Sequence, residues 1–354
     1  MRKFIFVALF CFISKALIAQ TDIKSLAHQL SEKQANDSLK VVAFYNWISN
    51  NIEYDYATYK SMYPLLDLGQ TQSCSNVLTT KKALCGGYSN LFYQLCKQVG
   101  IKAEIIEGLG KVRNSSDPKD HTYRFESHAW NAVKLANKWY LLDLTWSAGA
   151  ILNEQFIKKL NLEFYMPSPT AFRETHWPSD PLWQLSYLPI SKDAFIQNKP
   201  NQGALLPYFS FPDTLKIYER LDSTQKVLNS QKRVLHFDPS NDNAKNILGF
   251  HSATVSLTYL EKYAQLSRKI KNKKTPQEQQ RTALDNKEQL YALLKQGEEE
   301  LRKGLWYYDS ISDQAKIKGI PENKKAIFQN LEAIEKDREM LGKYFVMIQR
   351  MRQP

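Results

Sequence analysis

The stretch that decides the fold of this chain runs from Leu84 to Gly100 and reads LCGGYSNLFYQLCKQVG. Its apolar residues recur at intervals of three and four, which is the spacing of one face of an α-helix: Tyr88, Leu91, Phe92, Leu95, Cys96 and Val99. Gly100 then ends the helix, as glycine commonly does. The stretch predicts a helix with one buried face that begins at a cysteine, Cys85.

Cys85 stands in the first turn of this predicted helix, where a thiol can become a nucleophile. Unpaired amide groups and the dipole at a helix start stabilise a thiolate and lower the cysteine pKa from its usual value of about 8.5. Gly86 and Gly87 add no bulk beside the sulfur, so a substrate backbone can approach it. The alternative is that Cys85 is a small buried residue like Cys96, since free cysteines are usually buried and inert.

Short apolar runs after this helix predict strands over residues 103–106, 128–135 and 139–144. A polar loop, Lys111 to Asp120, separates the first two. A short turn over residues 135–138 predicts an antiparallel hairpin with Asp143 opposite His128 or within about two residues of it. A carboxylate there can hold one imidazole nitrogen while the other faces a thiol. Taken singly, the histidine also fits a core or surface position and the aspartate a turn.

Blocks of sequence around these residues match one family in order: residues 84–92 (LCGGYSNLF), Gly100-Ile101, Gly108, residues 128–133 (HAWNAV) and residues 138–146 (KWYLLDLTW). They resemble the transglutaminase-like superfamily. A lead-in over residues 47–55 and a trailing segment over residues 164–185 are similar to its kyphoscoliosis-peptidase branch. The resemblance covers roughly residues 21–200. One departure is His176-Trp177-Pro178, where the branch would have a smaller residue between histidine and proline; this segment is expected outside the triad.

The resemblance implies an α+β fold with a papain-like, transglutaminase-like core, in which the helix of the nucleophile packs on an antiparallel sheet. It makes Cys85 the nucleophile, His128 the general base and later acid, and Asp143 the residue that orients the imidazole. The implied reaction is acyl transfer: the thiolate attacks a peptide or glutaminyl carbonyl, a thioester forms, and water or an amine resolves it. Hydrolysis is preferred because the similar branch is peptidase-like and the chain has no calcium-loop signature.

Other parts of this implied site are less determined. The Cys85 backbone amide should contribute to an oxyanion hole. Tyr54 and Asn76 are candidates for the second donor, although core packing and turn formation fit them at least as well. Trp130 and Trp146 either shield the site from water or belong to the bulk hydrophobic core.

Residues 1–19 predict a signal peptide. Arg2 and Lys3 precede an apolar run from Phe4 to Ile13, and small residues stand before Gln20, where a signal peptidase would cut. The alternative, a membrane anchor, needs roughly 18 uninterrupted apolar residues, and Lys15 interrupts the run. We therefore expect an exported protein, periplasmic or extracellular, without a transmembrane span.

Cleavage of this peptide leaves Cys74, Cys85 and Cys96, an odd number, so at least one thiol is free. Cys85 and Cys96 lie roughly 16 Å apart along a helix, whereas the Cα separation in a disulfide stays below about 7 Å. A disulfide between Cys74 and Cys96 is not excluded by the sequence, because an exported chain can form disulfides. The sequence contains no Cys-x-x-Cys or His-Glu-x-x-His motif, so zinc is disfavoured and no metal or cofactor is expected.

The chain has 354 residues, of which 43% are apolar and 24% charged, as in ordinary folded proteins of one large or two moderate domains. Proline and glycine punctuate a connector near residue 200, and long amphipathic segments follow. We expect a transglutaminase-like domain over residues 20–200 and an all-α domain over residues 201–354. Breaks near residues 238–239, 275–276 and 319–321 predict about four helices in a bundle.

The formal net charge of +12 bears on the partners of the protein. A basic excess can indicate nucleic-acid binding, but an exported chain rarely meets nucleic acid. Anionic glycans or lipid head groups of a cell envelope or surface suit it better, or there is no specific partner.

Two functional hypotheses follow. The first is a secreted thiol peptidase or amidase that acts on a protein or peptide substrate. The second is a catalytically silent scaffold or binding protein of the same fold that works through its carboxy-terminal helices, since a fold alone does not settle function.

Overall fold

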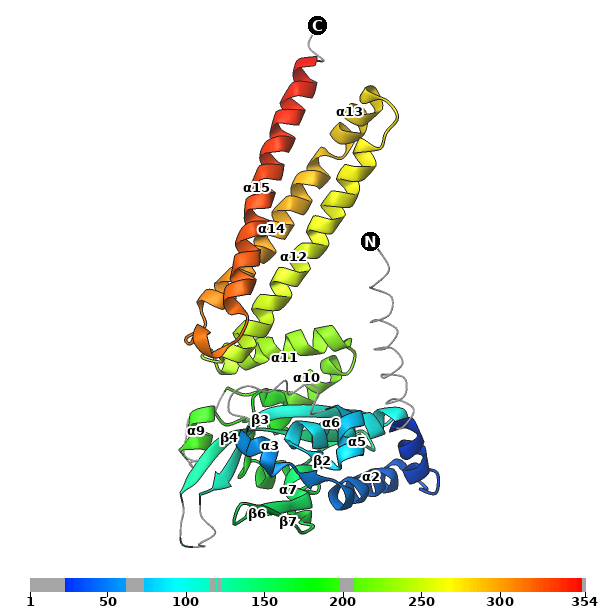
Figure 1. Ribbon diagram of the computed structural model, residues 1–354, viewed down its shortest axis with the longest axis vertical. Coiled ribbons are helices and arrows are strands. Elements are labelled where there is room, and N and C mark those ends of the chain that lie inside the picture. Colours follow the sequence, from blue (N-terminus) through cyan, green and yellow to red (C-terminus); the bar gives the residue numbers. More distant parts are fainter. Residues whose placement is uncertain (1–22, 62–72, 115–118, 120–121, 198–206, 352–354) are drawn as a thin grey trace. The chain divides into compact units, whose positions relative to one another are not determined.

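The computed structural model describes residues 23–61, 73–114, 119, 122–197 and 207–351 (Figure 1). The predicted signal peptide, part of the predicted loop before residue 120 and most of the predicted connector lie outside the described residues. The chain divides into two compact units, residues 1–216 and residues 217–354.

A four-stranded antiparallel sheet organises the first unit, with strand order β5-β4-β3-β8. Its strands are β3 (Ala103–Arg113), β4 (Tyr123–Leu135), β5 (Lys138–Leu142) and β8 (His176–Pro178). Helix α6 (Cys85–Gln98) packs on β3 and β4. Asn131 of β4 fixes this contact, because its buried side-chain amide donates to the Ser89 carbonyl in α6 at 3.0 Å.

The core of this unit lies between α6, the sheet and the preceding helix α2 (Asp37–Asn51). The apolar face predicted for α6 is buried, including Tyr88, Leu91, Phe92, Leu95 and Cys96. Gly100 follows the helix with φ +75°, a conformation that glycine adopts without strain. Trp177 and Phe195 form a separate apolar cluster with Leu109 and Phe125 of the sheet. The predicted α+β fold, with the helix of Cys85 on an antiparallel sheet, is confirmed.

The remaining elements of the first unit are short. They are β1 (Glu53–Tyr54), α3 (Tyr56–Ser61), α5 (Cys74–Thr80), β2 (Lys82–Ala83), α7 (Leu144–Ala148), β6 (Gly149–Leu152), β7 (Gln155–Lys158), η1 (Leu162–Phe164), α8 (Pro169–Phe172), η2 (Pro181–Gln184), α9 (Lys192–Ile196) and α10 (Phe211–Tyr218), which crosses into the second unit. Residues 23–31 are also helical. Strands β1 and β2 form a parallel pair and β6 and β7 an antiparallel pair.

The sheet differs from the prediction in the length of its three predicted strands and in a fourth strand, β8, that was not predicted. β5 ends at Leu142, so Asp143 lies just beyond it. β3 and β4 pair over eleven residues, from Ala103↔Val133 to Arg113↔Tyr123, so Lys111 belongs to a strand and not to the predicted loop. The predicted β4–β5 hairpin is present, and Ala136 and Asn137 have the positive φ angles of a tight two-residue turn. The sequence does not predict the outer part of β3 and β4, because that part carries polar side chains such as Arg124 and lacks an apolar pattern.

Gly108 allows β8 to approach β3, and this predicts a strong mutational effect. A Cβ atom at this position would lie 2.1 Å from the Trp177 carbonyl oxygen and 2.8 Å from Cη2 of Trp130. Gly108→Ala should lower the free energy of unfolding by about 3 kcal/mol or more, since a backbone atom cannot give way cheaply. The matched control is Gly342→Ala in an open helical position, where the nearest atom is 4.0 Å away. Urea unfolding that shows equal stability for the two variants would contradict this packing.

The second unit is helical, as predicted. Its helices are α11 (Ser223–Phe237), α12 (Asp242–Lys271), α13 (Pro276–Asp285), α14 (Lys287–Asp309) and α15 (Ile320–Met351), with a 3₁₀ turn η3 (Gln314–Lys316). Helices end and new helices begin close to the three predicted breaks. Thr275 caps α13, and Pro276 occupies its first turn. A further break at Asn286 separates α13 from α14, so the described residues contain one more long helix than the predicted four.

The two apolar stripes of the second unit meet in its core. Leu294 and Leu301 of α14 are buried with Ile327 and Ile334 of α15. Arg338 interrupts the α15 stripe and pairs with Glu298 of α14, so this polar position has a partner. Among the described residues, no helix combines the length and the apolar character needed to cross a membrane.

Candidate active site

Cys85 is the first residue of α6, as the sequence predicts. Leu84 is the N-cap residue of this helix and makes no side-chain capping hydrogen bond. Cys85 as a residue is partly exposed, although its thiol is largely buried. The His128 side chain and the Ala129 backbone both act on the pKa of this thiol, which places them near it. Cys74 and Cys96 are also free thiols, so the disulfide considered between them does not form.

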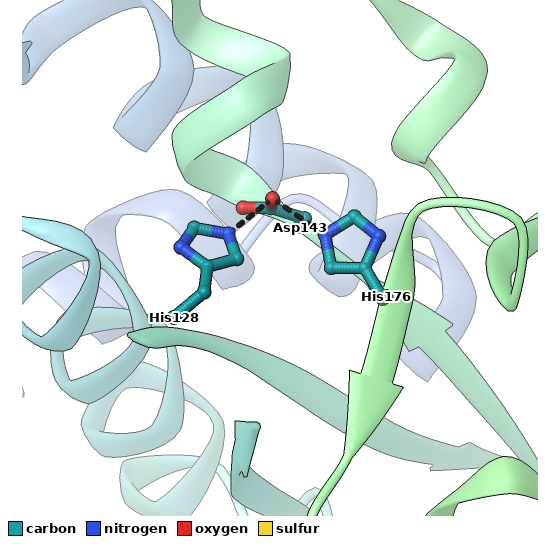
Figure 2. Close-up of side chains that lie close together, drawn as sticks. All are labelled: His128, Asp143 and His176. Carbon is teal, nitrogen blue, oxygen red and sulfur yellow. Dashed lines mark hydrogen bonds and ion pairs between the residues drawn. The ribbon is translucent and has the colours of Figure 1, made fainter. Parts of the chain in front are cut away.

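His128 lies on β4 between this thiol and Asp143. Its side chain is only 8% exposed, and Nε2 lies 2.8 Å from Oδ2 of Asp143 (Figure 2). With Nε2 engaged by the carboxylate, Nδ1 is left for the thiol of Cys85. The predicted contact of the imidazole with Asp143 is present, and its pairing with Cys85 stays a prediction.

Asp143 follows β5 and is the N-cap residue of α7. The β4–β5 register, which pairs Asn131 with Leu142, brings it close to the predicted position relative to His128. Its side chain is fully buried, and Oδ1 accepts from the amides of Thr145 at 2.7 Å and Trp146 at 3.2 Å. The helix start thus fixes one carboxylate oxygen and leaves Oδ2 to face His128.

The electrostatics of the three groups favour separated charges. Burial by itself raises the pKa of the Cys85 thiol, but the hydrogen bond and charge of His128 outweigh it and lower that pKa below its usual value. Burial by itself lowers the pKa of His128, but Asp143 raises it to about 10. Burial would raise the pKa of Asp143, yet the neighbouring imidazoles hold it well below its usual range. The arrangement favours a thiolate, an imidazolium and a carboxylate in sequence.

A second histidine, His176, also contacts Asp143. His176 of β8 is fully buried, and its Nε2 lies 3.1 Å from the same Oδ2 of Asp143 (Figure 2). His176 is not one of the three predicted triad residues, but it contacts one of them, which the sequence analysis did not predict. β8 pairs with β3, with His176 opposite Gly110, and this non-local pairing carries the ring to the carboxylate. The only sequence signal was the unusual His-Trp-Pro segment.

Aromatic rings surround the imidazoles. Trp146 stacks on His128 with ring centroids 5.0 Å apart, and Trp130 lies 5.0 Å from the His176 ring. Phe172 stacks on His176 at 4.0 Å. Gly110 makes room for this arrangement, since a Cβ there would lie 3.0 Å from Trp146 and 3.3 Å from Cβ of His128. Both tryptophans contact the imidazoles, so they exclude water from the hydrogen bonds to Asp143.

The two candidates for a second oxyanion donor lie in different elements. Tyr54 of β1 pairs with Ala83, two residues before the nucleophile. Burial raises the pKa of its hydroxyl, and the charge of Cys85 raises it further, which places the phenol near the thiol. Asn76 lies in the first turn of α5. Both assignments remain predictions.

The cluster of His128, Asp143 and His176 also offers three possible metal-ligand atoms, all within 4.8 Å of one another. In the structure, the two Nε2 atoms and Oδ2 are engaged in direct hydrogen bonds with one another. We therefore interpret the cluster as a hydrogen-bonded unit.

The opposite pKa shifts of the two histidines predict how stability depends on pH. His128, whose pKa rises from 6.5 to about 10, contributes stability that is complete below pH 6.5 and is lost as pH rises through about 10. His176, whose pKa falls from 6.5 to about 4, contributes stability that is complete above pH 6.5 and is lost as pH falls through about 4.

The lowered pKa of Cys85 must be counted with these shifts, because the folded state loses a thiol proton where His128 gains one, and the two effects cancel between pH 6.5 and the usual thiol pKa of about 8.5. Urea unfolding should therefore give the greatest stability across this interval, with a decline below it from His176 and Asp143 and a decline above it from His128. His128→Gln should remove most of the alkaline decline. Stability that increases between neutral pH and the pKa of His128 would contradict the raised value.

Comparison with known proteins finds similarity to one family. Residues 24–144 match the model of the Transglutaminase-like superfamily. Kyphoscoliosis peptidase of Homo sapiens is 30% identical over 182 residues, covering 51% of this chain and 27% of that protein. The Mus musculus kyphoscoliosis peptidase is 30% identical over 186 residues with the same coverage. The chain thus spans about a quarter of the length of these curated relatives. A solved structure of a TGase is 24% identical, covers 41% of this chain and 35% of that chain, and has a TM-score of 0.30.

The predicted resemblance is confirmed, and together with a cysteine at a helix start it supports a cysteine-dependent enzyme. Residues 24–144 of this chain thus carry a match to the transglutaminase-like superfamily, and the first half of the chain is similar to kyphoscoliosis peptidase.

Proposed function

We propose that this protein is an exported acyl-transfer enzyme, a thiol peptidase or amidase that uses Cys85, His128 and Asp143 as its catalytic triad. One observation carries the proposal: Nε2 of His128 is bonded to the buried carboxylate of Asp143 at 2.8 Å, and the same imidazole lowers the pKa of the Cys85 thiol at the start of α6. This order of groups is the one that activates a thiol as a nucleophile.

The first half of the proposed reaction forms a thioester. The Cys85 thiolate attacks the carbonyl carbon of a peptide or side-chain amide, and a carbon–sulfur bond forms. The amide of Cys85 at the start of α6 lies where the developing oxyanion can accept from it. The His128 imidazolium then donates its proton to the amide nitrogen, the carbon–nitrogen bond breaks and the amine leaves.

The second half regenerates the enzyme. Neutral His128 takes a proton from water, and the resulting oxygen nucleophile attacks the thioester carbon. The carbon–sulfur bond breaks, the product leaves as a carboxylic acid, and thiolate and imidazolium are restored. Asp143 keeps Nε2 of His128 protonated throughout, so Nδ1 is always the atom that exchanges a proton. An amine in place of water would give transamidation by the same steps.

Protein or peptide substrates fit this chemistry, as in a kyphoscoliosis peptidase. Export rests on the sequence of residues 1–19 and is part of the proposal. The net charge of +12 suits work near an anionic cell envelope or surface.

The test is turnover of a peptide library in water enriched in ¹⁸O, with and without a primary amine. We expect new carboxyl termini that carry one heavy oxygen, and Cys85→Ala should produce none. Products that contain the amine and no heavy oxygen would assign transamidation instead of hydrolysis. If the intact protein gives neither product, nor a thioester trapped on Cys85, the enzyme hypothesis fails and a scaffold of the same fold is favoured.

A further inference from the structure

His176 shares one oxygen of Asp143 with the proposed general base. Its Nε2 lies 3.1 Å from Oδ2, and Nε2 of His128 lies 2.8 Å from the same atom. The two rings approach the carboxylate from different strands, β8 and β4, and lie on either side of it (Figure 2). All three side chains are buried, so no solvent competes freely for this oxygen.

The hydrogen-bonding capacities fix the tautomer of His176. An ionised carboxylate only accepts hydrogen bonds, so both Nε2 atoms must carry hydrogen. His176 is neutral at physiological pH, because burial lowers its pKa to about 4 despite the nearby carboxylate. Its Nδ1 is then an acceptor, and the Thr175 hydroxyl lies 2.8 Å away to donate to it.

Apart from Asp143, the neighbours of the His176 ring are a few polar groups and several aromatic rings. The charged groups that influence it are Asp143 and His128, and the Phe172 carbonyl also faces the ring. Aromatic rings cover its other sides: Phe172, Trp130, Trp146 and Phe164. His176 is thus a neutral donor aimed at a single carboxylate oxygen.

The orientation of Asp143 does not depend on this donor. The amides of Thr145 and Trp146 already hold Oδ1 at the start of α7. What His176 adds is a second hydrogen bond on Oδ2, and a carboxylate oxygen that accepts two such bonds attracts the proton of either partner less strongly.

We propose that His176 is a positioning residue that shares Oδ2 of Asp143 with His128 and thereby limits how tightly this carboxylate holds the imidazolium proton. For the reaction this inference rests on the proposed function: a less tightly held proton is given up more readily to the leaving amine. Without His176, the carboxylate would stabilise the imidazolium more strongly and slow that step at neutral pH.

The test compares His176→Phe with His176→Gln in the full chain. Phenylalanine keeps an aromatic ring against Phe172 but removes the donor, whereas glutamine can place an amide N–H near the position of Nε2. The readout is the pKa of His128 from NMR titration of ¹⁵N-histidine-labelled protein. We expect His176→Phe to raise this pKa by about one unit and His176→Gln to leave it near the wild-type value.

A purely space-filling role predicts a different pattern. In that case His176→Phe would leave the pKa of His128 unchanged, or both variants would shift it alike, and either result overturns the proposal. The alkaline limb of the pH–turnover profile should move with the pKa of His128. It should shift to higher pH in His176→Phe and lie near the wild-type position in His176→Gln.

The wild-type spectrum gives a second test if the phenylalanine variant does not fold. At neutral pH, His176 should be a neutral ring protonated at Nε2 and not at Nδ1. The opposite tautomer, or an imidazolium, would overturn the inference. Neither NMR result depends on turnover, so a protein with the predicted spectra but no activity would refute the proposed function alone.

Discussion

Cys85→Ala is expected to reduce turnover by about 10⁴-fold or more, because no other group can form the thioester. The substitution should leave the fold intact. Cys85 is partly exposed at a helix start, and its change to alanine removes a single heavy atom. Initial rates on the best peptide from the library, together with urea unfolding, measure both effects.

Cys74→Ala is the matched control for that loss. Cys74 is also a free, partly exposed thiol at the first residue of a helix, α5, but burial raises its pKa to about 11. Its replacement should leave turnover unchanged. An active Cys85→Ala protein, or an inactive Cys74→Ala protein that folds normally, would remove Cys85 from the proposed role.

Asp143→Asn is expected to lower turnover by about 10⁴-fold while changing the side-chain volume very little. The asparagine oxygen can still accept from the amides of Thr145 and Trp146, so the helix cap is retained. The amide nitrogen, however, would then point at two imidazole nitrogens that now donate. To accept a hydrogen bond from this amide at Nε2, neutral His128 must adopt the tautomer that is protonated at Nδ1. A protonated Nδ1 cannot take a proton from a thiol or from water.

Asp222→Asn controls for the change of residue type at a helix start. Asp222 caps α11 in the second unit, where its side chain accepts from the Gln225 amide at 2.8 Å. Its replacement should alter stability slightly and turnover not at all. If Asp143→Asn keeps a large part of wild-type turnover, the carboxylate does not orient His128.

The local parts of the candidate site could be predicted from the sequence. Helical periodicity after Cys85 places the thiol at a helix start, and a short turn before Lys138 places Asp143 near His128 in a hairpin. Both inferences depend on neighbours in the chain, where periodicity and turn length are informative.

The non-local parts could not be predicted in this way. His176 is 33 residues from Asp143 and reaches it only because β8 pairs with β3. Nothing in the alternation of a three-residue strand specifies that partner. The outer half of the β3–β4 ladder was not predicted for another reason. It carries polar residues such as Lys111 and Arg124, so it lacks the apolar alternation of a half-buried strand.

Reactivity of the Cys85 thiol as a function of pH tests the central claim most directly. The claim is that His128, held by Asp143, keeps this sulfur as a thiolate. Mass spectrometry of peptides after timed exposure to iodoacetamide gives separate rates for Cys85 and Cys74 in one protein. At about pH 6, we expect Cys85 to react at least 10-fold faster than Cys74, and His128→Ala should abolish the difference. A Cys85 rate that stays low until pH approaches the usual thiol pKa of about 8.5, and that does not respond to His128→Ala, would contradict the account.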